Sequence, residues 1–249
     1  MARYDVIGHG YAARRREDPA IAAAIARALG DARSVVNIGA GAGSYEPSDR
    51  HVIAVEPSAV MAAQRPPERV PAIRANAGSL PLFDAGVDAA MSVLSLHHRD
   101  DEQERGVREM RRVARGPVVI VSYDAGIDPA MWLLADYLPE VAELDARTFP
   151  PIDRVAGWLG GDVTATPLPV SRDTPDWHMG SYWAHPERVL DAEARSTTSG
   201  FARMPPEVID RLVTTLSRDL ESGAWEEKHG HLRDLDEYDV GMRIVVGRP

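Results

Sequence analysis

The sequence predicts an α/β fold with a doubly wound, mostly parallel sheet, and two observations lead to this prediction. Short apolar runs alternate with helix-like stretches over residues 34–122, an order typical of a parallel sheet covered by helices on both faces. The first apolar run leads directly into a glycine-rich turn at residues 39–43. With 249 residues, 44% of them hydrophobic, the chain is long enough for one sizeable core and an attached subdomain.

The first predicted element is a helix over residues 18–30. Asp18 is a good N-cap, Pro19 fits the first turn, and Gly30 ends the helix. The later elements follow from apolar runs and from helical periodicity. The predicted strands are residues 34–38, 51–55, 71–74, 87–93, 117–122, 162–170 and 240–247, and the predicted helices are residues 58–65, 100–114 and 205–222.

Charge and composition exclude several classes of partner. A formal net charge of −10 opposes nucleic acid as a partner, because each phosphate contact needs Lys or Arg. No run reaches the roughly 20 apolar residues of a membrane span, and the first residues contain no apolar signal segment. We therefore expect no membrane partner and a cytoplasmic location. The lack of cysteine excludes disulfides and thiolate metal sites.

The glycine turn predicts a ligand whose nature depends on the residues around it. Gly39, Gly41 and Gly43 let backbone amides approach a cofactor closely. Ser44 stands where a dinucleotide fingerprint has glycine or alanine, and no Gly-Lys-Ser/Thr follows for a phosphate loop. The next strand ends in Glu56, and a carboxylate there can accept two hydrogen bonds from a ribose diol. Turn and acid together favour a nucleoside site.

Further segments continue this pattern in the same order. They are Ala-Asn-Ala-Gly-Ser-Leu-Pro-Leu-Phe at 75–83, Gly-Val-Asp-Ala-Ala-Met-Ser at 86–92, Leu-Ser-Leu-His-His-Arg-Asp-Asp at 94–101 and a helix end at 109–115. With these landmarks the stretch resembles the class I S-adenosylmethionine-dependent methyltransferases, in particular small-molecule enzymes of the ubiquinone-biosynthesis type. The resemblance implies a Rossmann-like sheet with an antiparallel last strand, S-adenosylmethionine as cofactor, and methyl transfer to a small organic acceptor.

The resemblance also divides the chain into parts. Residues 1–30 are expected to form an N-terminal lid and helix, 31–170 the cofactor-binding core, and 240–249 its final strand. Residues 171–239 exceed a plain connection and predict a helical cap. Because Trp and Tyr supply stacking and apolar area, this cap favours a planar or partly apolar acceptor. Its aromatic and histidine residues are Trp177, His178, Tyr182, Trp183, Trp225, His229 and His231.

By resemblance, cofactor-binding roles fall on particular residues. The turn glycines would wrap the methionine part, Glu56 would take both ribose hydroxyls, and Asn76 would accept from adenine where the family usually has Asp. Asn37 replaces the acid that commonly opens the glycine motif, which removes some attraction for a cationic sulfonium. Tyr11 and Arg15 would close over the methionine carboxylate. The implied cofactor residues are Tyr11, Arg15, Gly39, Gly41, Gly43, Glu56, Pro57, Asn76, Ala77 and Leu94.

Histidines are the candidates for a general base, which a hydroxyl acceptor needs and a carbon or sulfur acceptor can omit. His178 lies in the predicted cap, and His98 follows the fourth strand beside His97. The competing interpretations are an aromatic core cluster for His178 and a packing and helix-entry element for His97 and His98. The pair His229 and His231 has no third ligand at helical spacing, so no metal is expected.

Two alternatives from other classes stay open. A NAD-dependent oxidoreductase shares the glycine turn, although Ser44 and the Leu-His-His landmark disfavour it. A methyltransferase-like fold could also bind the nucleoside without methyl transfer, and the amides Asn37 and Asn76 in place of acids keep this alternative open. The favoured hypothesis is S-adenosylmethionine-dependent methyl transfer to a small organic acceptor.

Overall fold

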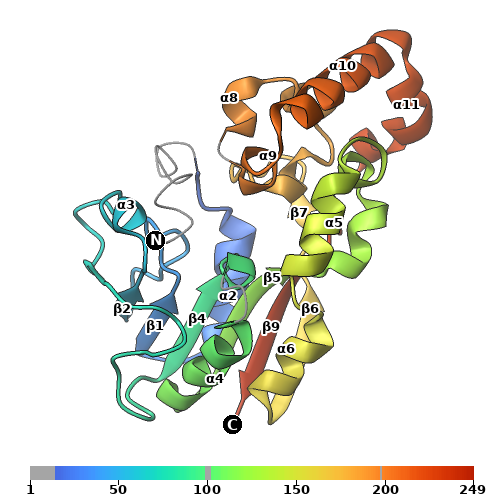
Figure 1. Cartoon of the computed structure of the whole chain (residues 1–249). Coiled ribbons are helices and arrows are strands. Elements are labelled where there is room, and N and C mark those ends of the chain that lie inside the picture. The colour runs from blue at the N-terminus through green and yellow to red at the C-terminus, as the bar shows by residue number, and fades with distance from the viewer. Residues whose placement is uncertain (1–14, 99–101, 197) are drawn as a thin grey trace.

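The chain folds around one seven-stranded sheet. The computed structural model describes residues 15–98, 102–196 and 198–249, and the strands take the order β3-β2-β1-β4-β5-β9-β6 (Figure 1). The strands β1 to β5 pair in parallel, whereas β9 runs antiparallel to both of its neighbours. The predicted doubly wound sheet with an antiparallel last strand is confirmed. Its strands are β1 (Ser34–Ile38), β2 (His51–Val55), β3 (Ala72–Ile73), β4 (Ala89–Val93), β5 (Val118–Tyr123), β6 (Asp162–Pro167) and β9 (Met242–Arg248).

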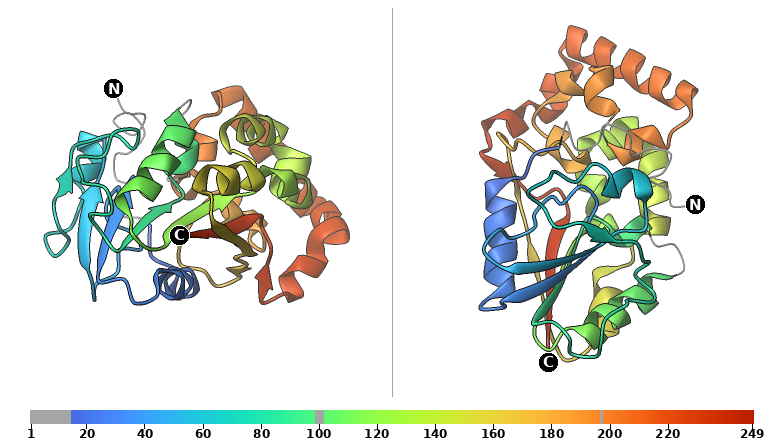
Figure 2. Two further views of the ribbon diagram at one scale, coloured as in Figure 1. Left: turned by 90° about the horizontal axis from the view of Figure 1, so that it is seen from below. Right: turned by 90° about the vertical axis from the view of Figure 1, so that its left-hand side faces the viewer.

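Helices cover both faces of this sheet (Figure 2). α2 (Pro19–Leu29) lies on one face, and α4 (Gln103–Val113) and α6 (Ile152–Leu159) lie on the other. Because successive side chains of a strand point to opposite faces, each central strand contributes to both layers of the core. The α2 layer contains Val35, Ala89, Met91, Val119 and Val121, and the α4 and α6 layer contains Val36, Ile38, Ala90, Val118 and Ile120.

Local capping explains where the first helix begins and ends. The Asp18 carboxylate accepts the N–H groups of Ala20 at 2.7 Å and Ile21 at 3.2 Å, and Gly30 ends the helix with a φ of 55°. The predicted helix over 18–30 is therefore confirmed with its caps. α3 (Ala59–Ala62) is one turn long. None of the helices in the described ranges combines the length and the apolar character that a membrane span requires.

The predicted strand over residues 162–170 divides into two strands of different sheets. β6 ends at Pro167, and β7 (Val170–Ser171) pairs instead with β8 (Glu237–Tyr238) in a small antiparallel ribbon. A proline cannot donate to a sheet ladder, which is a physical reason for the break. The chain leaves the core sheet at this point and enters the cap.

The cap lies above the carboxyl ends of the parallel strands (Figure 1). Two elements that precede β6 in the chain, η4 (Leu133–Tyr137) and α5 (Pro139–Thr148), also pack against it. The Arg211 guanidinium donates to both carboxylate oxygens of Glu140, at 2.5 and 2.7 Å. The cap helices are α7 (Pro186–Val189), α8 (Ala192–Arg195), α9 (Ser199–Ala202), α10 (Pro206–Ser222) and α11 (Ala224–His229), joined by η5 (Met179–Tyr182) and η6 (Gly230–Asp234).

Most large aromatic residues of the cap fill its own core. Trp183, Tyr182 and Trp225 are almost fully buried, and Trp132 packs edge-on against Trp225 with ring centroids 5.4 Å apart. The indole N–H of Trp132 donates to the Trp183 carbonyl at 2.8 Å. The aromatic content of residues 171–239 therefore stabilises the cap, and it is not by itself a sign of a planar acceptor.

Candidate functional site

The residues predicted to bind a cofactor follow neighbouring strands at one edge of the sheet. The N–H groups of Gly39 and Ala40, after β1, donate to the Val55 carbonyl at the end of β2, at 2.9 and 3.0 Å. The N–H of Glu56 donates in turn to the Ile73 carbonyl at the end of β3, at 3.0 Å. These bonds hold the glycine turn, the acid after β2 and the loop after β3 side by side.

The three turn glycines all have a backbone conformation that favours glycine. Their φ values are 74° for Gly39, 51° for Gly41 and 98° for Gly43, which costs an L-residue about 1 kcal/mol or more. A Cβ on Gly41 would lie 3.2 Å from the Met61 methyl group. Glycine is therefore favoured here by conformation, and a Cβ at Gly41 would also require the Met61 side chain to shift.

Glu56 is built to accept further hydrogen bonds. Its Oε2 accepts the Gly41 N–H at 2.8 Å, and its Oε1 accepts the Ser58 N–H at 2.7 Å. The side chain is buried, and burial raises the pKa of its carboxyl above the ordinary value although these two N–H groups oppose the shift. Each carboxylate oxygen has a second lone pair, so the pair of oxygens fits two neighbouring hydroxyls such as a ribose diol.

A buried carboxylate lies beside Asn37, where the family pattern has an acid. The Asn37 side-chain amide donates to Oε1 of Glu46 at 3.0 Å, and Arg65 donates to Oε2 at 2.7 Å. Arg65 also donates to the Gly41 carbonyl at 3.3 Å. Asn37 has no carboxylate of its own, but the Glu46 carboxylate lies next to it and is ion-paired with Arg65. Only the fold brings these three residues together.

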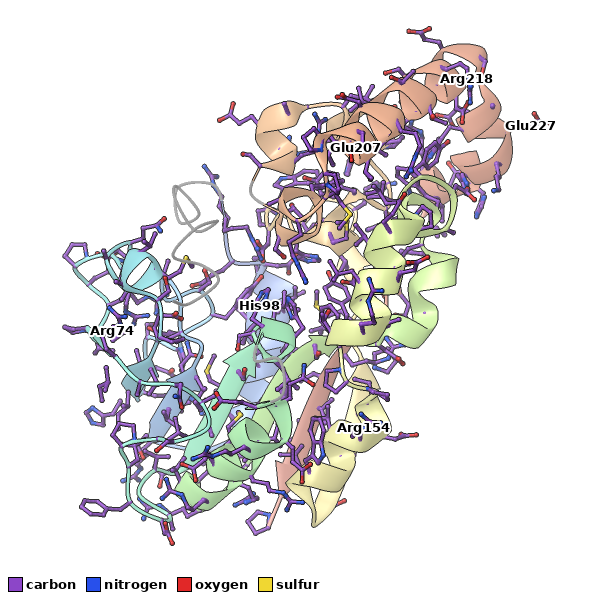
Figure 3. All side chains as sticks on the ribbon, in the orientation of Figure 1. Arg74, His98, Arg154, Glu207, Arg218 and Glu227 are labelled. Atoms are coloured by element: carbon purple, nitrogen blue, oxygen red, sulfur yellow. The ribbon has the colours of Figure 1, made fainter. Side chains whose placement is uncertain are left out.

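A pocket lies where the carboxyl edge of the sheet meets the cap. The sheet contributes residues after β4 and at the end of β5, and the cap contributes residues from η5 and α9. His98, labelled in Figure 3, lies between the sheet and the cap. The lining residues are Arg15, Leu94, His97, His98, Tyr123, Val141, Asp145, Phe149, His178, Met179, Thr198, Ser199, Gly200 and Arg203.

His178 forms a buried pair with Tyr123 in this pocket. The Tyr123 hydroxyl lies 2.5 Å from Nδ1 of His178 and accepts the Gly180 N–H at 3.1 Å. Burial lowers the pKa of His178 to about 4, although the nearby Asp176 carboxylate opposes this shift. Nε2 of His178 is buried and has no hydrogen-bond partner among the described residues. His178 therefore lines the pocket as a neutral imidazole whose Nε2 is buried.

A buried polar network lies next to this pair. Asp176 accepts the Tyr45 hydroxyl at 2.6 Å and two hydrogen bonds from the Arg15 guanidinium, the longer at 2.9 Å. Burial alone would raise the pKa of Asp176, but Arg15 holds it below its ordinary value. Arg15 belongs to a run of three arginines, a pattern usual for a solvated surface, yet its side chain is only 10% exposed.

The structure brings together some of the predicted site residues and leaves others apart. His98, His178, Leu94 and Arg15 line the same pocket. Ala77 is buried beside the sheet edge, whereas Pro57 and Asn76 are exposed. Tyr11 lies outside the described residues. Sequence reasoning missed Tyr123, Asp176, Tyr45 and Glu46, and the one available signal was the position of Tyr123 at the end of a predicted strand.

The histidines after β4 show the packing contact that one interpretation expects, and the base role stays a prediction. His97 stacks on Phe149 with ring centroids 4.1 Å apart, which is the predicted packing role, and both residues line the pocket with His98. In the cap, Nε2 of His229 pairs with Asp136 at 2.7 Å. Throughout the described part of the chain, no three His, Asp or Glu residues lie close enough together to bind a metal ion.

Comparison with known proteins identifies the family. Residues 36–120 match a family model described as a methyltransferase domain. Two proteins of Mycobacterium tuberculosis, from two strains and each described as a probable S-adenosylmethionine-dependent methyltransferase, are 30% identical over 212 residues, which cover 80% of this chain and 70% of theirs. The chain belongs to the S-adenosylmethionine-dependent methyltransferases. Its cofactor is S-adenosylmethionine, and this assignment replaces the NAD-dependent oxidoreductase alternative.

This methyltransferase is also similar to proteins of known structure. A putative methyltransferase from an antibiotic biosynthesis pathway of Anabaena variabilis is 32% identical, with a TM-score of 0.86 over 94% of this chain and 98% of that one. Geranyl diphosphate C-methyltransferase of Streptomyces coelicolor, crystallised with S-adenosylhomocysteine, is 15% identical, with a TM-score of 0.51 over 91% of this chain and 76% of that one. The second similarity concerns the fold alone.

Proposed function

We propose that this methyltransferase methylates a hydroxyl group of a small, partly apolar organic acceptor, and that His178 removes the hydroxyl proton. The observation that supports this most directly is the shared pocket. It joins Leu94, at the carboxyl end of β4, to His178 of the cap. In sheets of this kind ligands bind at the carboxyl edge, so a base in this pocket is close to the expected cofactor site.

The cofactor site that we propose consists of the glycine turn, Glu56 and Ala77, with Leu94 at the methionine end. The fit rests on two observations. Gly39, Gly41 and Gly43 all have positive φ values. Among the described residues each oxygen of the buried Glu56 carboxylate accepts one hydrogen bond, which leaves a lone pair on each for the cofactor. S-adenosylmethionine supplies the methyl group when it is bound there. Pro57 and Asn76 would contact it from the exposed rim.

The lining of the pocket supports the proposed acceptor chemistry. Leu94, Val141, Phe149 and Met179 give it an apolar side. The charged residues of the lining are Arg15, which is paired with the Asp176 carboxylate, Arg203 and Asp145. The Anabaena relative, named for an antibiotic biosynthesis pathway, also supports a small organic acceptor. Planarity of the acceptor would come from contact with the Phe149 and Tyr123 rings.

The Tyr123–His178 pair determines which nitrogen can act as the base. When Nδ1 of His178 is protonated and donates to the Tyr123 oxygen, Nε2 has a free lone pair and accepts the acceptor's proton. Bound S-adenosylmethionine would supply the methyl group to the acceptor oxygen, with its sulfonium sulfur as the leaving group. The resulting imidazolium donates through Nδ1 to Tyr123. The hydroxyl of Tyr123, which can accept as well as donate, is compatible with this tautomer and holds the ring orientation.

The direct test is methyl transfer from methyl-labelled S-adenosylmethionine to a panel of small phenols, hydroxy acids and amines. We expect turnover with a hydroxylated member, and a loss of about 100-fold or more in kcat for His178→Gln. His185→Gln is the matched control, because His185 lies in the same cap and its Nε2 donates to the Arg172 carbonyl at 2.8 Å, outside the pocket. Cofactor binding without turnover on any member would favour the alternative of a binding protein.

A further inference from the structure

We propose that Tyr45 and Asp176 are positioning residues that connect the cofactor turn to the acceptor pocket, so that cofactor binding orders the cap segment around His178. The inference rests on the proposed placement of the cofactor at the glycine turn. It concerns residues that neither the family pattern nor the sequence singled out, and it assigns a role to a buried polar network that methyl transfer itself does not require.

Tyr45 has an unfavourable backbone conformation that contacts with its neighbours hold in place. It is separated from Gly43, the last glycine of the turn, by Ser44 and has a φ of 63°, in the left-handed region. Its N–H donates to a Glu17 carboxylate oxygen at 2.9 Å, and its hydroxyl accepts the Asp18 N–H at 3.1 Å. Non-glycine residues keep such a backbone only where surrounding contacts impose it. The position of the turn is therefore tied to the position of the Tyr45 ring.

The Tyr45 ring reaches the cap through one short hydrogen bond. Its hydroxyl donates to Oδ2 of Asp176 at 2.6 Å, between residues 131 positions apart in the chain. Both residues are buried, and burial together with the Asp176 charge raises the pKa of the Tyr45 hydroxyl. The phenol is therefore a donor at all ordinary pH values. A buried hydrogen bond to a carboxylate is stronger than one between neutral groups.

Asp176 fixes the backbone that presents His178. Its carbonyl oxygen accepts the His178 N–H at 3.1 Å and the Ser181 hydroxyl. Ser181 Oγ in turn accepts the His178 N–H at 3.2 Å. Asp176 and His178 are therefore parts of one tight turn, in which the backbone of Asp176 is hydrogen-bonded to the backbone of His178.

The guanidinium of Arg15 completes the connection. It donates twice to Asp176 and also lines the pocket, so the carboxylate, the base and the pocket wall share one network. Such a network has few arrangements that satisfy all of its groups, because an unpaired buried charge is costly. A change in the glycine turn therefore reaches His178 through Tyr45 and Asp176.

Hydrogen exchange with S-adenosylhomocysteine as the probe tests this connection. In the wild-type protein we expect saturating S-adenosylhomocysteine to slow exchange of the amides in residues 174–182 by about tenfold, within the usual range for coupled sites. Tyr45→Phe should still bind the probe by calorimetry but should lose this slowing to within about twofold. Asp176→Asn should lose it as well, which provides a second test if Tyr45→Phe folds poorly.

Tyr182→Phe is the matched control. It removes another buried hydroxyl of the same cap, one that donates to the Ala194 carbonyl at 2.9 Å. The amides of residues 174–182 should exchange faster in this variant than in the wild type, with and without the probe, but the probe should still slow them. This result separates a positioning role from a general loss of stability. Two results would overturn this inference but not the proposed cofactor site. In the first, S-adenosylhomocysteine binds the wild type tightly without slowing exchange in residues 174–182. In the second, the probe slows exchange in Tyr45→Phe as much as in the wild type. No binding to the wild type would overturn the proposed cofactor site too.

Discussion

The Tyr123 hydroxyl and Nδ1 of His178 lie 2.5 Å apart, and the same hydroxyl accepts the Gly180 N–H. One side chain from the end of β5 thus satisfies both a backbone donor and a ring nitrogen of the cap. Because an unpaired buried polar group costs about 1 to 3 kcal/mol, this hydroxyl stabilises the junction of core and cap as well as orienting the imidazole.

Tyr123→Phe should therefore destabilise the protein by about 2 to 3 kcal/mol, since it leaves two buried groups without a partner. Urea denaturation followed by circular dichroism measures this loss. Tyr137→Phe is the control, because the Tyr137 hydroxyl donates to the partly exposed Asp219, where water replaces it, and the expected cost is below about 1 kcal/mol. Equal costs for the two variants would contradict the buried pair.

His178 should make stability fall as the pH falls from about 6.5 to about 4. The folded protein holds its pKa at about 4, below the ordinary value of 6.5, so the unfolded chain takes up this proton first. The contribution of neutral His178 to the free energy of unfolding is complete above pH 6.5 and is lost as the pH falls toward 4. The total loss is on the order of 3 kcal/mol. Urea denaturation between pH 7 and 4.5 measures the loss.

The variant His178→Gln should lose less stability over that pH range than the wild type. The comparison removes the contribution of other acidic groups, which both proteins share. His51→Gln serves as the control, because His51 is exposed on β2, and it should follow the wild-type curve. A His178→Gln curve parallel to that of the wild type would mean that His178 is not buried in the neutral form.

The core of the fold could be predicted from the sequence because its signals are local. Asp18, Pro19 and Gly30 bound a helix within a few residues, and the apolar runs before Gly39 and Glu56 are short buried strands. Each of these patterns depends on neighbours in the chain. The same reasoning placed the glycine turn and Glu56 at one sheet edge, since parallel strands end there together.

The rest of the site depends on contacts between distant segments. Tyr45 and Asp176 meet across 131 positions, and Tyr123 and His178 across 55, so no local pattern indicates them. The helices α7, α8 and α9 have four residues each, which is too short for helical periodicity to be read. The arginine run around Arg15 has the composition of a solvated surface, and only the position of Asp176 explains its burial.

Gly41→Ala should weaken cofactor binding far more than it weakens the fold. Its φ of 51° is positive like the 55° of Gly30, so both Gly41→Ala and the control Gly30→Ala should lose about 1 kcal/mol of stability or more. A Cβ on Gly30 has no atom within 4 Å, whereas one on Gly41 meets Met61 at 3.2 Å.

Calorimetry with S-adenosylhomocysteine separates the two glycines. Gly41→Ala should lose about tenfold or more in affinity, because the amides of the turn can no longer approach the ligand as closely. Gly30→Ala should bind like the wild type. Comparable affinities for both variants would remove the turn from the cofactor site.

Glu56→Ala should weaken S-adenosylhomocysteine binding by about 100-fold or more, since it deletes two charge-assisted hydrogen bonds of about 1.5 to 3 kcal/mol each. Glu104→Ala removes an exposed carboxylate that pairs with Arg108 on α4 and should leave the affinity unchanged. If Glu56→Ala bound within about twofold of the parent, the carboxylate after β2 would not hold the ribose.

A crystal structure of the protein with S-adenosylhomocysteine tests the central claim most directly. We expect both ribose hydroxyls within about 3.2 Å of the Glu56 carboxylate oxygens, the methionine part against the turn of Gly39, Gly41 and Gly43, and the sulfur facing the pocket that contains Leu94 and His178. A nucleoside bound elsewhere, or a sulfur directed away from His178 so that no acceptor could reach both, would contradict the account.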